Sequence, residues 1–447
     1  MQRGQFSSRL AFILAASGSA VGLGNIWGFP TNAAENGGGA FLLMYLVMAF
    51  LLAYPALMAE LVIGRHSRAN MVSALQAVAP SQKSADIGKV AGLLGIMTAS
   101  MILCFYSIVA GWMVAHTIDS VAQIVAPGHF SGWLVSFSFS RNLVFAILFI
   151  GLTLWVISAG VEQGIEKWSR RLMPSLIALL VGLIMYVLLQ EGAQAGLRLF
   201  LIPNFSEITE PSLIISAMGQ AFFSMSLGVG TMLIYGSYLS GDENLPTVGV
   251  LVTLADTGVA VLAGMLVLPA LFVAHNLGVT IHSDNGSLMS GPDLIFQVLP
   301  ALFSSMGTAG PFLSLAFFVL MSIAALTSSI SMLEAPVSWA VETRQITRVK
   351  ASILTGLLVM IISTVIALYF EALFGLVVQV TTEWAQPLLS MVLCLFCGWL
   401  FHRDHLLREL AKGYPEVSAS LFWRIWPIYV KLFCPVLILL VIAQNIF

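Results

Sequence analysis

Eleven stretches of this chain are apolar over the length that crosses a bilayer as one helix, which takes about 20 residues. Because lipid offers the backbone no hydrogen bonds, such stretches fold as transmembrane helices. Only 9% of the residues are charged, against about 25% in soluble domains. The sequence therefore predicts an all-α polytopic membrane protein with eleven transmembrane helices. Their approximate ranges are 10–34, 40–63, 90–124, 142–160, 173–190, 213–239, 245–275, 309–341, 351–370, 373–401 and 425–445.

The positive charges lie almost entirely on one side of these predicted spans. If the N-terminus is cytoplasmic and the segments alternate, only Arg141 and Arg198 of the 19 lysine and arginine residues face outward. Cytoplasmic loops of membrane proteins carry this excess of positive charge. We expect a multi-pass protein of the inner (plasma) membrane with a cytoplasmic N-terminus and an extracytoplasmic C-terminus. The net charge of −2 gives no indication of a nucleic-acid partner.

The first apolar stretch contains three glycines within seven residues, Gly18, Gly22 and Gly24. Each glycine costs a helix interior about 1 kcal/mol relative to alanine, so this stretch favours a break in the helix. A break within the membrane frees backbone carbonyls that can bind a small cation and N–H groups that can bind an anion. The alternative is that these small residues only allow neighbouring helices to pack closely.

A second candidate break lies in the sixth stretch, where residues 224–230 contain two glycines. Two interrupted spans five helices apart indicate two halves of inverted topology with a binding site between them. The eighth stretch adds neighbouring hydroxyl groups at Thr327 and Ser328. These hydroxyls either bond to carbonyls of their own helix or join freed carbonyls in a site that binds a hard cation through oxygen atoms.

Four acidic residues lie within or beside predicted spans: Glu60, Asp256, Glu334 and Glu383. Ionisable groups are rare at such positions and are usually functional. Each of these carboxylates could instead be a hydrogen-bond partner for a broken helix, which is the interpretation we favour for Glu60 and Glu334. Phe223 adjoins the second candidate break, and we expect it to cap a ligand there.

The two glycine-rich segments belong to longer motifs. Residues 18–27 read Gly-Ser-Ala-Val-Gly-Leu-Gly-Asn-Ile-Trp, and residues 35–41 read Glu-Asn-Gly-Gly-Gly-Ala-Phe. Together with residues 220–230 and 327–329, they resemble the neurotransmitter:sodium symporter family, in particular its bacterial amino-acid transporter branch, typified by the leucine transporter. The resemblance implies the leucine-transporter fold, with unwound helices 1 and 6. Its parts would be a first inverted five-helix repeat at 1–190, a second at 213–401, and a cytoplasmic loop with helix 11 at 402–447.

The same resemblance implies two sodium sites built mainly from uncharged oxygen atoms. The first would use backbone carbonyls and two hydroxyls, from Gly18, Val21, Ala324, Thr327 and Ser328. The second would use the Ala20 carbonyl, the side chains of Asn25 and Ser224, and the carboxylate of the substrate. Sodium and the substrate would therefore bind next to each other.

An amino acid is the substrate that the resemblance implies. Its carboxylate would be held by the N–H groups of Leu23 and Gly24 and by the Tyr106 hydroxyl. Its ammonium group would meet carbonyls around Ala20, Phe223 and Ser226. The side chain would be surrounded by Ile102, Phe223, Val229, Ser328 and Met332. These wall residues are uncharged, so we expect a neutral, hydrophobic amino acid.

The chain keeps the family pattern at the inner gate but departs from it at the outer gate. Arg3, Tyr238 and Glu342 resemble the inner gate. At the outer gate, Gly28 stands at the position of the family's arginine, and Thr382 at the position of its acidic partner. The outer gate must therefore close without this ion pair.

The seventh stretch also departs from the leucine-transporter pattern. Ala255 stands where that transporter has an asparagine sodium ligand, and Val259 where it has a buried glutamate that replaces chloride. Asp256 lies three residues before Val259, on the same helix face. Its carboxylate either supplies the missing negative charge, and is itself a sodium ligand, or caps a local backbone break and touches no ion. We favour the charge role and expect no chloride requirement.

Taken together, these features predict a sodium-coupled symporter that imports a neutral, hydrophobic amino acid by alternating access, with two sodium ions, in a lipid bilayer. A sodium-dependent amino-acid sensor that does not transport is the alternative on the same scaffold. A channel fits less well because no repeated pore loop is visible. We predict no enzymatic activity, since the sequence contains no constellation of a nucleophile with a base.

Overall fold

The computed structural model describes residues 4–126, 131–281 and 294–444. Every regular element in these ranges is a helix, and no strand occurs there. The all-α architecture predicted from the apolar stretches is therefore confirmed for this part of the chain.

The elements labelled α are α-helices, and those labelled η are short turns of π or 3-10 helix that lie between them or extend them. The first part of the chain contains α1 (Arg9–Ala20), η1 (Gly24–Gly28), α2 (Phe29–Glu35), α3 (Gly39–Met48), η2 (Ala49–Ala53), α4 (Tyr54–Ser67), α5 (Met71–Val78), α6 (Gln82–Val125), α7 (Ser131–Val135), α8 (Phe139–Ser158), η3 (Val161–Glu166), α9 (Lys167–Leu188) and α10 (Ala193–Leu201). The second part contains α11 (Pro211–Ser224), α12 (Thr231–Ser237), α13 (Leu245–Asn276), η4 (Leu294–Val298), α15 (Leu299–Ser305), η5 (Gly307–Ala309), α16 (Gly310–Arg344), α17 (Arg348–Leu368), α18 (Phe370–Val378), η6 (Gln379–Ala385), α19 (Gln386–Leu395), η7 (Phe396–Leu400), α20 (Arg403–Ala411), η8 (Pro415–Ala419), α21 (Leu421–Ile428), η9 (Tyr429–Phe433) and α22 (Cys434–Gln444).

Helices long and apolar enough to cross a membrane account for nearly all of the predicted spans. Among the described residues there are nine such helices, and the bent pair of α1 with residues 24–35 makes up to ten. They coincide with every predicted stretch except 213–239, which is divided between α11 and α12. The division follows from Gly228 and Gly230, whose φ angles of +89° and +78° are left-handed and interrupt a right-handed helix.

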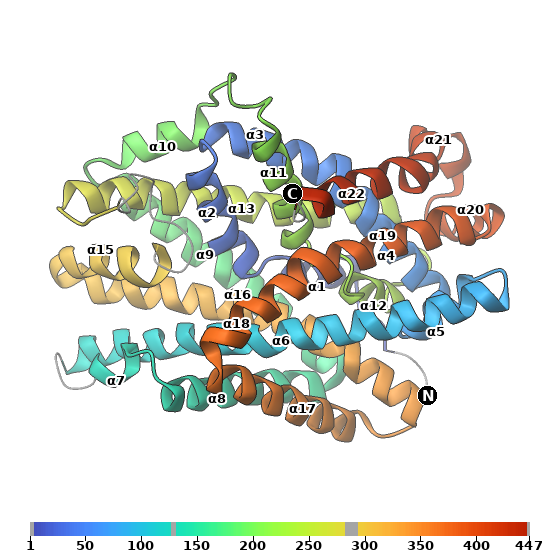
Figure 1. Ribbon diagram of the computed structural model, residues 1–447, viewed down its shortest axis with the longest axis horizontal. Helices are drawn as coiled ribbons and strands as arrows, with labels where there is room; N and C mark the ends of the chain where they lie inside the picture. The colour runs from blue at the N-terminus through green and yellow to red at the C-terminus, as the bar shows by residue number, and fades with distance from the viewer. Residues whose placement is uncertain (1–3, 127–130, 282–293, 445–447) are drawn as a thin grey trace.

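The bundle is elongated, and its long helices run roughly side by side (Figure 1). The helices α5 and α20 lie at one end, and α7 and α15 lie at the other (Figure 1). The most extensive pairing in the described chain is between α6 and α16, and α1 packs against α9, α13 and α16. The first helix is therefore central, and residues at its end face several other helices.

The sequence also predicts a long outer loop at about 276–308 that ends in an apolar helical segment over 293–302. Asp293 lies outside the described residues. From Leu294 onward the chain is helical in η4 and α15, so the prediction is confirmed for the part that the structure describes.

A buried ion pair ties α20 to the end of α4. The Arg65 guanidinium donates to Glu409 Oε1 over 2.8 Å, and each of the two side chains is 1% exposed. Lys412 Nζ lies 2.7 Å from Glu409 Oε2, and Arg65 also donates to the Glu243 carbonyl over 2.6 Å. Because neither charge is left without a partner, the pair avoids the large penalty of an isolated buried ion.

Candidate functional site

The first candidate break is an interruption between α1 and η1. The helix α1 ends at Ala20, and the segment that follows from Gly24 is bent from it by 57°. The extended conformation of Val21, with ψ of 101°, turns its carbonyl out of the helix. The Ser328 hydroxyl of α16 lies 3.3 Å from the carbonyl oxygens of both Ser19 and Val21. A hydroxyl and at least two backbone carbonyls therefore converge at the interruption.

Small residues allow α16 to approach the interruption this closely. A Cβ atom placed on Gly22 would lie 2.5 Å from Ser328 Oγ, and one placed on Gly18 would lie 3.3 Å from Thr327 Cβ. Thr327 Oγ1 bonds to the carbonyls of Ile323 and Ala324 in its own helix. The five residues of the first predicted sodium site therefore lie close together. The two alternatives to a cation site, close helix packing and a hydroxyl bonded within its own helix, are both present there as well.

The second predicted set is joined by side-chain hydrogen bonds across three helical elements. Asn25 Nδ2 donates to Ser224 Oγ over 2.9 Å and lies 2.8 Å from Asp256 Oδ1. Ser224 Oγ donates to Asp256 Oδ2 over 2.6 Å. All three side chains are at most 1% exposed. The aspartate from the seventh predicted stretch therefore belongs to the same cluster as the predicted ligands from the first and sixth.

Tyr45 and Gln220 surround this cluster. The Tyr45 hydroxyl lies 3.1 Å from Ser224 Oγ and donates to Asp256 Oδ2 over 3.4 Å. Gln220 Nε2 donates to the Gly24 carbonyl over 2.7 Å. The helix α13 continues without interruption through Asp256, so this carboxylate does not cap a backbone break in its own helix.

The chain between α11 and α12 forms the second interruption. Glu60 of α4 reaches it and accepts hydrogen bonds from the N–H groups of Gly228 over 2.7 Å and Leu233 over 3.2 Å. These donors belong to the interruption and to the first turn of α12, where helical partners are missing. The structural interpretation of Glu60 as a partner for a broken helix agrees with these contacts.

Both interruptions face one small cavity of about 30 Å³. All eleven residues predicted to bind the substrate line it: Ala20, Leu23, Gly24, Ile102, Tyr106, Phe223, Ser224, Ser226, Val229, Ser328 and Met332. The cavity is also lined by Gly22 and Gln386. The Tyr106 hydroxyl accepts a long hydrogen bond from the Leu23 N–H, 3.4 Å, and the Ser226 hydroxyl donates to the Ser19 carbonyl over 3.3 Å.

Comparison with known proteins shows the family of the chain. A model of the sodium:neurotransmitter symporter family matches residues 3–134 and 134–447. The chain belongs to the sodium:neurotransmitter symporter family. Among its relatives, the uncharacterized sodium-dependent transporter YhdH of Bacillus subtilis is 31% identical, with 99% of this chain and 97% of YhdH covered.

Two further relatives of the family match over their whole length. An uncharacterized sodium-dependent transporter of Haemophilus influenzae is 32% identical, with 100% of this chain and 99% of the relative covered. The crystal structure of MhsT in complex with L-phenylalanine matches with a TM-score of 0.86 at 35% identity, and covers 99% of this chain and 100% of MhsT. YhdH and the Haemophilus influenzae relative are both named sodium-dependent transporters, and the family is one of symporters and not of enzymes. Membership of this family assigns the chain to sodium-dependent membrane transporters.

A second cavity, of about 390 Å³, includes the two positions at which the sequence analysis expected the outer gate. Gly28 and Thr382 line it, as does Glu383. The Thr382 hydroxyl donates to the Val378 carbonyl in its own turn, so it does not replace the missing acidic partner. Phe223 and Gln386 are the residues that line both this cavity and the smaller one.

The predicted inner-gate residues do not share one set of contacts among the described residues. Arg3 lies outside the described residues. The Tyr238 hydroxyl donates to Glu334 of α16, which also pairs with Arg348 at the start of α17. Glu342 Oε2 accepts hydrogen bonds from the backbone N–H and side-chain amide of Asn70, over 2.9 and 2.7 Å. The sequence analysis missed Arg348, whose only signal is a positive charge just after a span.

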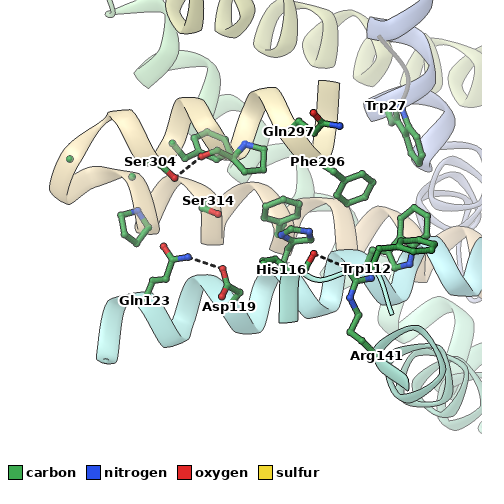
Figure 2. Close-up of a pocket in the computed structure, with 18 of the residues that line it drawn as sticks. Trp27, Trp112, His116, Asp119, Gln123, Arg141, Phe296, Gln297, Ser304 and Ser314 are labelled. Atoms are coloured by element: carbon green, nitrogen blue, oxygen red, sulfur yellow. Dashed lines mark hydrogen bonds between the residues drawn. The ribbon is translucent and has the colours of Figure 1, made fainter. Parts of the chain in front are cut away.

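A much larger cavity, of about 980 Å³, is lined by Trp27 of η1 but by none of the predicted site residues. Figure 2 shows His116 between Trp112 and Asp119 along α6, with Phe296 of η4 on the facing side. Arg141, from α8, reaches it beside Trp112 (Figure 2). Its volume exceeds that of the small cavity, but all eleven residues predicted to bind the substrate line the small one, which we therefore take as the candidate site.

Proposed function

We propose that the protein is a sodium-coupled symporter that imports a neutral, hydrophobic amino acid by alternating access. The observation that carries this proposal is the convergence of both helix interruptions, with all the predicted substrate residues, on one cavity. Such sites between interrupted helices are typical of secondary transporters. Membership of the sodium:neurotransmitter symporter family supports the choice of cation.

The first sodium ion would bind between α1 and α16. Its ligands would be the carbonyls of Gly18, Val21 and Ala324 and the hydroxyls of Thr327 and Ser328. Oxygen atoms of this kind suit a hard cation. The Ser328 hydroxyl within 3.3 Å of the Val21 carbonyl supports this placement, because a cation between the two oxygen atoms would take the place of their hydrogen bond while the hydroxyl keeps its proton.

The second sodium ion would bind at the Ala20 carbonyl, Asn25 and Ser224, beside the substrate carboxylate. Asp256 Oδ1 and Oδ2 contact Asn25 and Ser224, which supports a role for this aspartate as a ligand or as the resident negative charge. The carboxylate would then do the work of a chloride ion, and transport would require no chloride. Because sodium would bridge the protein and the substrate, each would favour the binding of the other.

The amino acid would lie with its carboxylate at Leu23, Gly24 and Tyr106. Its ammonium group would meet carbonyls around Ala20 and Phe223 and the Ser226 side chain. The remaining walls, Ile102, Val229, Ser328 and Met332, would surround its side chain. Since the cavity measures only about 30 Å³, a bulky side chain enters only if flexible walls such as Met332 move.

We propose that these contacts sit in an eleven-span fold made of two inverted five-helix repeats, 1–190 and 213–401, with a loop and last helix at 402–447. The bend between α1 and η1 and the division between α11 and α12 support interrupted first and sixth spans. The N-terminus would be cytoplasmic, the C-terminus extracytoplasmic, and the location the inner membrane. Tyr238, Glu342 and Arg3 would contribute to the inner gate.

The relative MhsT was solved in complex with L-phenylalanine, which supports a hydrophobic amino acid as the substrate of this chain. The size of the substrate's side chain depends on Val229. The leucine transporter has a phenylalanine at the matching position, so the valine leaves more room for the substrate. Phenylalanine, leucine and tryptophan are therefore the first substrates to examine. An acidic or basic amino acid would place a second charge against uncharged walls, at a high cost.

The test is uptake into liposomes that contain the purified full-length protein. An inward sodium gradient is expected to drive uptake of a radiolabelled neutral amino acid, and an equal potassium gradient is expected not to. A thermal-shift screen of the twenty amino acids, with and without sodium, identifies the ligand to label. Uptake that ignores sodium, or selective binding of a charged amino acid, contradicts the proposal.

Substrate counterflow distinguishes a transporter from a sensor that does not transport. A transporter loaded inside with unlabelled amino acid accumulates the labelled form from outside, because the two exchange through the same site. A sensor binds the amino acid with sodium in the thermal-shift screen but gives no counterflow. Sodium-dependent binding without counterflow would therefore favour the sensor.

A further inference from the structure

Gln386 is the one residue of α19 that reaches the small cavity. It is the first residue of this helix, directly after η6, and it is 3% exposed. It also lines the 390 Å³ cavity, together with Phe223. The sequence analysis did not select Gln386, because a single glutamine in an apolar stretch carries no motif.

The side-chain oxygen of Gln386 is buried without a hydrogen-bond partner among the described residues. A buried acceptor left in this state costs about 1–3 kcal/mol. The hydroxyls that share the cavity are bonded within the protein: Tyr106 to Leu23, Ser224 to Asp256, Ser226 to Ser19, and Ser328 to Ser19 and Val21. Gln386 therefore supplies a spare acceptor to a cavity whose hydroxyls have partners.

The backbone of Gln386 packs against the second interruption. A Cβ atom on Gly228 would lie 2.2 Å from the Gln386 carbonyl oxygen, and the φ of Gly228 is +89°. The start of α19 is thus pressed against the chain next to Val229. The proposed carboxylate contacts come from η1 and α6, and the proposed ammonium contacts from α1 and residues 223–226. The cavity wall that contains Gln386 and Val229 is assigned to neither charged group of the substrate. We therefore assign this wall to the substrate's side chain.

We propose that Gln386 is a specificity-determining residue whose Oε1 accepts a hydrogen bond from a donor on the substrate's side chain. The ligand class is an aromatic amino acid whose side chain carries an N–H or O–H group. Tryptophan, with its indole N–H, is an example. This inference rests on the proposed function. A site that hydrogen-bonds a substrate group discriminates against an analogue without it, because the buried acceptor is then left without a partner.

The probes are L-tryptophan and 1-methyl-L-tryptophan, which differ in the indole N–H donor. Sodium-dependent binding of both is measured with the full-length protein in liposomes. The wild type is expected to bind tryptophan roughly three- to tenfold more tightly, the effect of one hydrogen bond. Gln386→Met keeps the length of the side chain but removes the acceptor, so the ratio is expected to fall to about one. Gln386→Asn, which withdraws the oxygen by one methylene, is a second variant and is expected to reduce the ratio as well.

Thr381→Val is the matched control. Thr381 lies five residues before Gln386, is 5% exposed, and donates its hydroxyl to the Val377 carbonyl over 2.6 Å. It lines none of the three cavities, so the variant is expected to keep the wild-type ratio. A ratio of one in the wild type, or an unchanged ratio in both Gln386 variants, overturns this inference. If the wild type binds no neutral amino acid in a sodium-dependent way, the proposed function fails, and this inference with it.

Discussion

Asn25 Nδ2 and Asp256 Oδ1 lie 2.8 Å apart, so the interruption of the first span is hydrogen-bonded to a carboxylate of α13. The contact is fully buried, because both side chains have no exposed area. An unpaired carboxylate at this depth would be costly. The hydrogen bond from Asn25 therefore connects the Asp256 carboxylate to the proposed sodium site.

The first prediction concerns this charge. We expect equal wild-type uptake in chloride and in gluconate buffer, because Asp256 already supplies the negative charge. In Asp256→Asn, sodium-driven uptake without chloride is expected to fall by about tenfold or more, since hydrogen bonds to a charged group contribute about 1.5–3 kcal/mol. The measurement is uptake of both proteins in both buffers. A wild type that stops without chloride, or a variant that works normally without it, would contradict the charge role.

The second prediction concerns the hydroxyls of α16. Thr327→Val keeps the shape of the side chain but removes one proposed ligand, so the sodium concentration for half-maximal uptake is expected to rise about tenfold. Ser338→Ala removes a hydroxyl of the same helix that donates to the Ala335 carbonyl, and it is the control. If Thr327→Val keeps the wild-type sodium dependence, the hydroxyl bonds only within its own helix.

The third prediction concerns the size of the substrate. Val229→Phe fills part of the cavity, and overpacking costs about 1–3 kcal/mol. Binding of tryptophan and phenylalanine is therefore expected to weaken roughly tenfold or more, with a smaller loss for alanine. Competition against one labelled substrate measures the series. Equal losses for large and small amino acids would show that Val229 does not contact the substrate's side chain.

The fourth prediction concerns stability and pH at Glu409, outside the spans. Burial raises the pKa of Glu409, but hydrogen bonds from His66 and Lys412 and the charge of Arg65 outweigh it, so the pKa falls from 4.5 to about 2. A lowered pKa means that the charged carboxylate stabilises the fold fully above pH 4.5, and that this contribution is lost as the pH falls toward 2.

Glu409→Gln leaves the guanidinium of Arg65 buried without its counter-ion, which costs about 3–5 kcal/mol. The variant is expected to unfold at a lower temperature in detergent at neutral pH, and to differ less from the wild type as the pH approaches 2. Asp404→Asn, in the same helix, changes an exposed carboxylate that is 3.8 Å from His402 and is expected to leave the unfolding temperature unchanged. Equal effects of the two substitutions would show that the buried pair contributes little.

The sequence predicted best what depends on neighbouring residues. Long apolar stretches gave the spans, and the glycines at 18, 22 and 24 gave the interruption that bends the first one by 57°. The motif residues then predicted which side chains share the small cavity. Each of these signals is local, because an apolar stretch or a glycine cluster acts on its own part of the backbone.

The partners of buried charges could not be predicted in the same way. Arg65 and Glu409 are separated by 344 positions, and nothing in either local sequence identifies the other. The sequence indicated that Glu60 is a partner for a broken helix. It did not indicate that the partners are the N–H groups of Gly228 and Leu233. Such pairings depend on how the helices assemble, which local patterns do not specify.

The hydroxyl of Ser328 has one proton to share between the carbonyls of Ser19 and Val21, both 3.3 Å away. Bonds of this length are weak, so a cation has little to displace when it arrives. When the proposed cation leaves, the hydroxyl could turn back to one of the same two oxygens. In the proposed transport cycle, this arrangement would keep the emptied site hydrogen-bonded while the carrier returns across the bilayer.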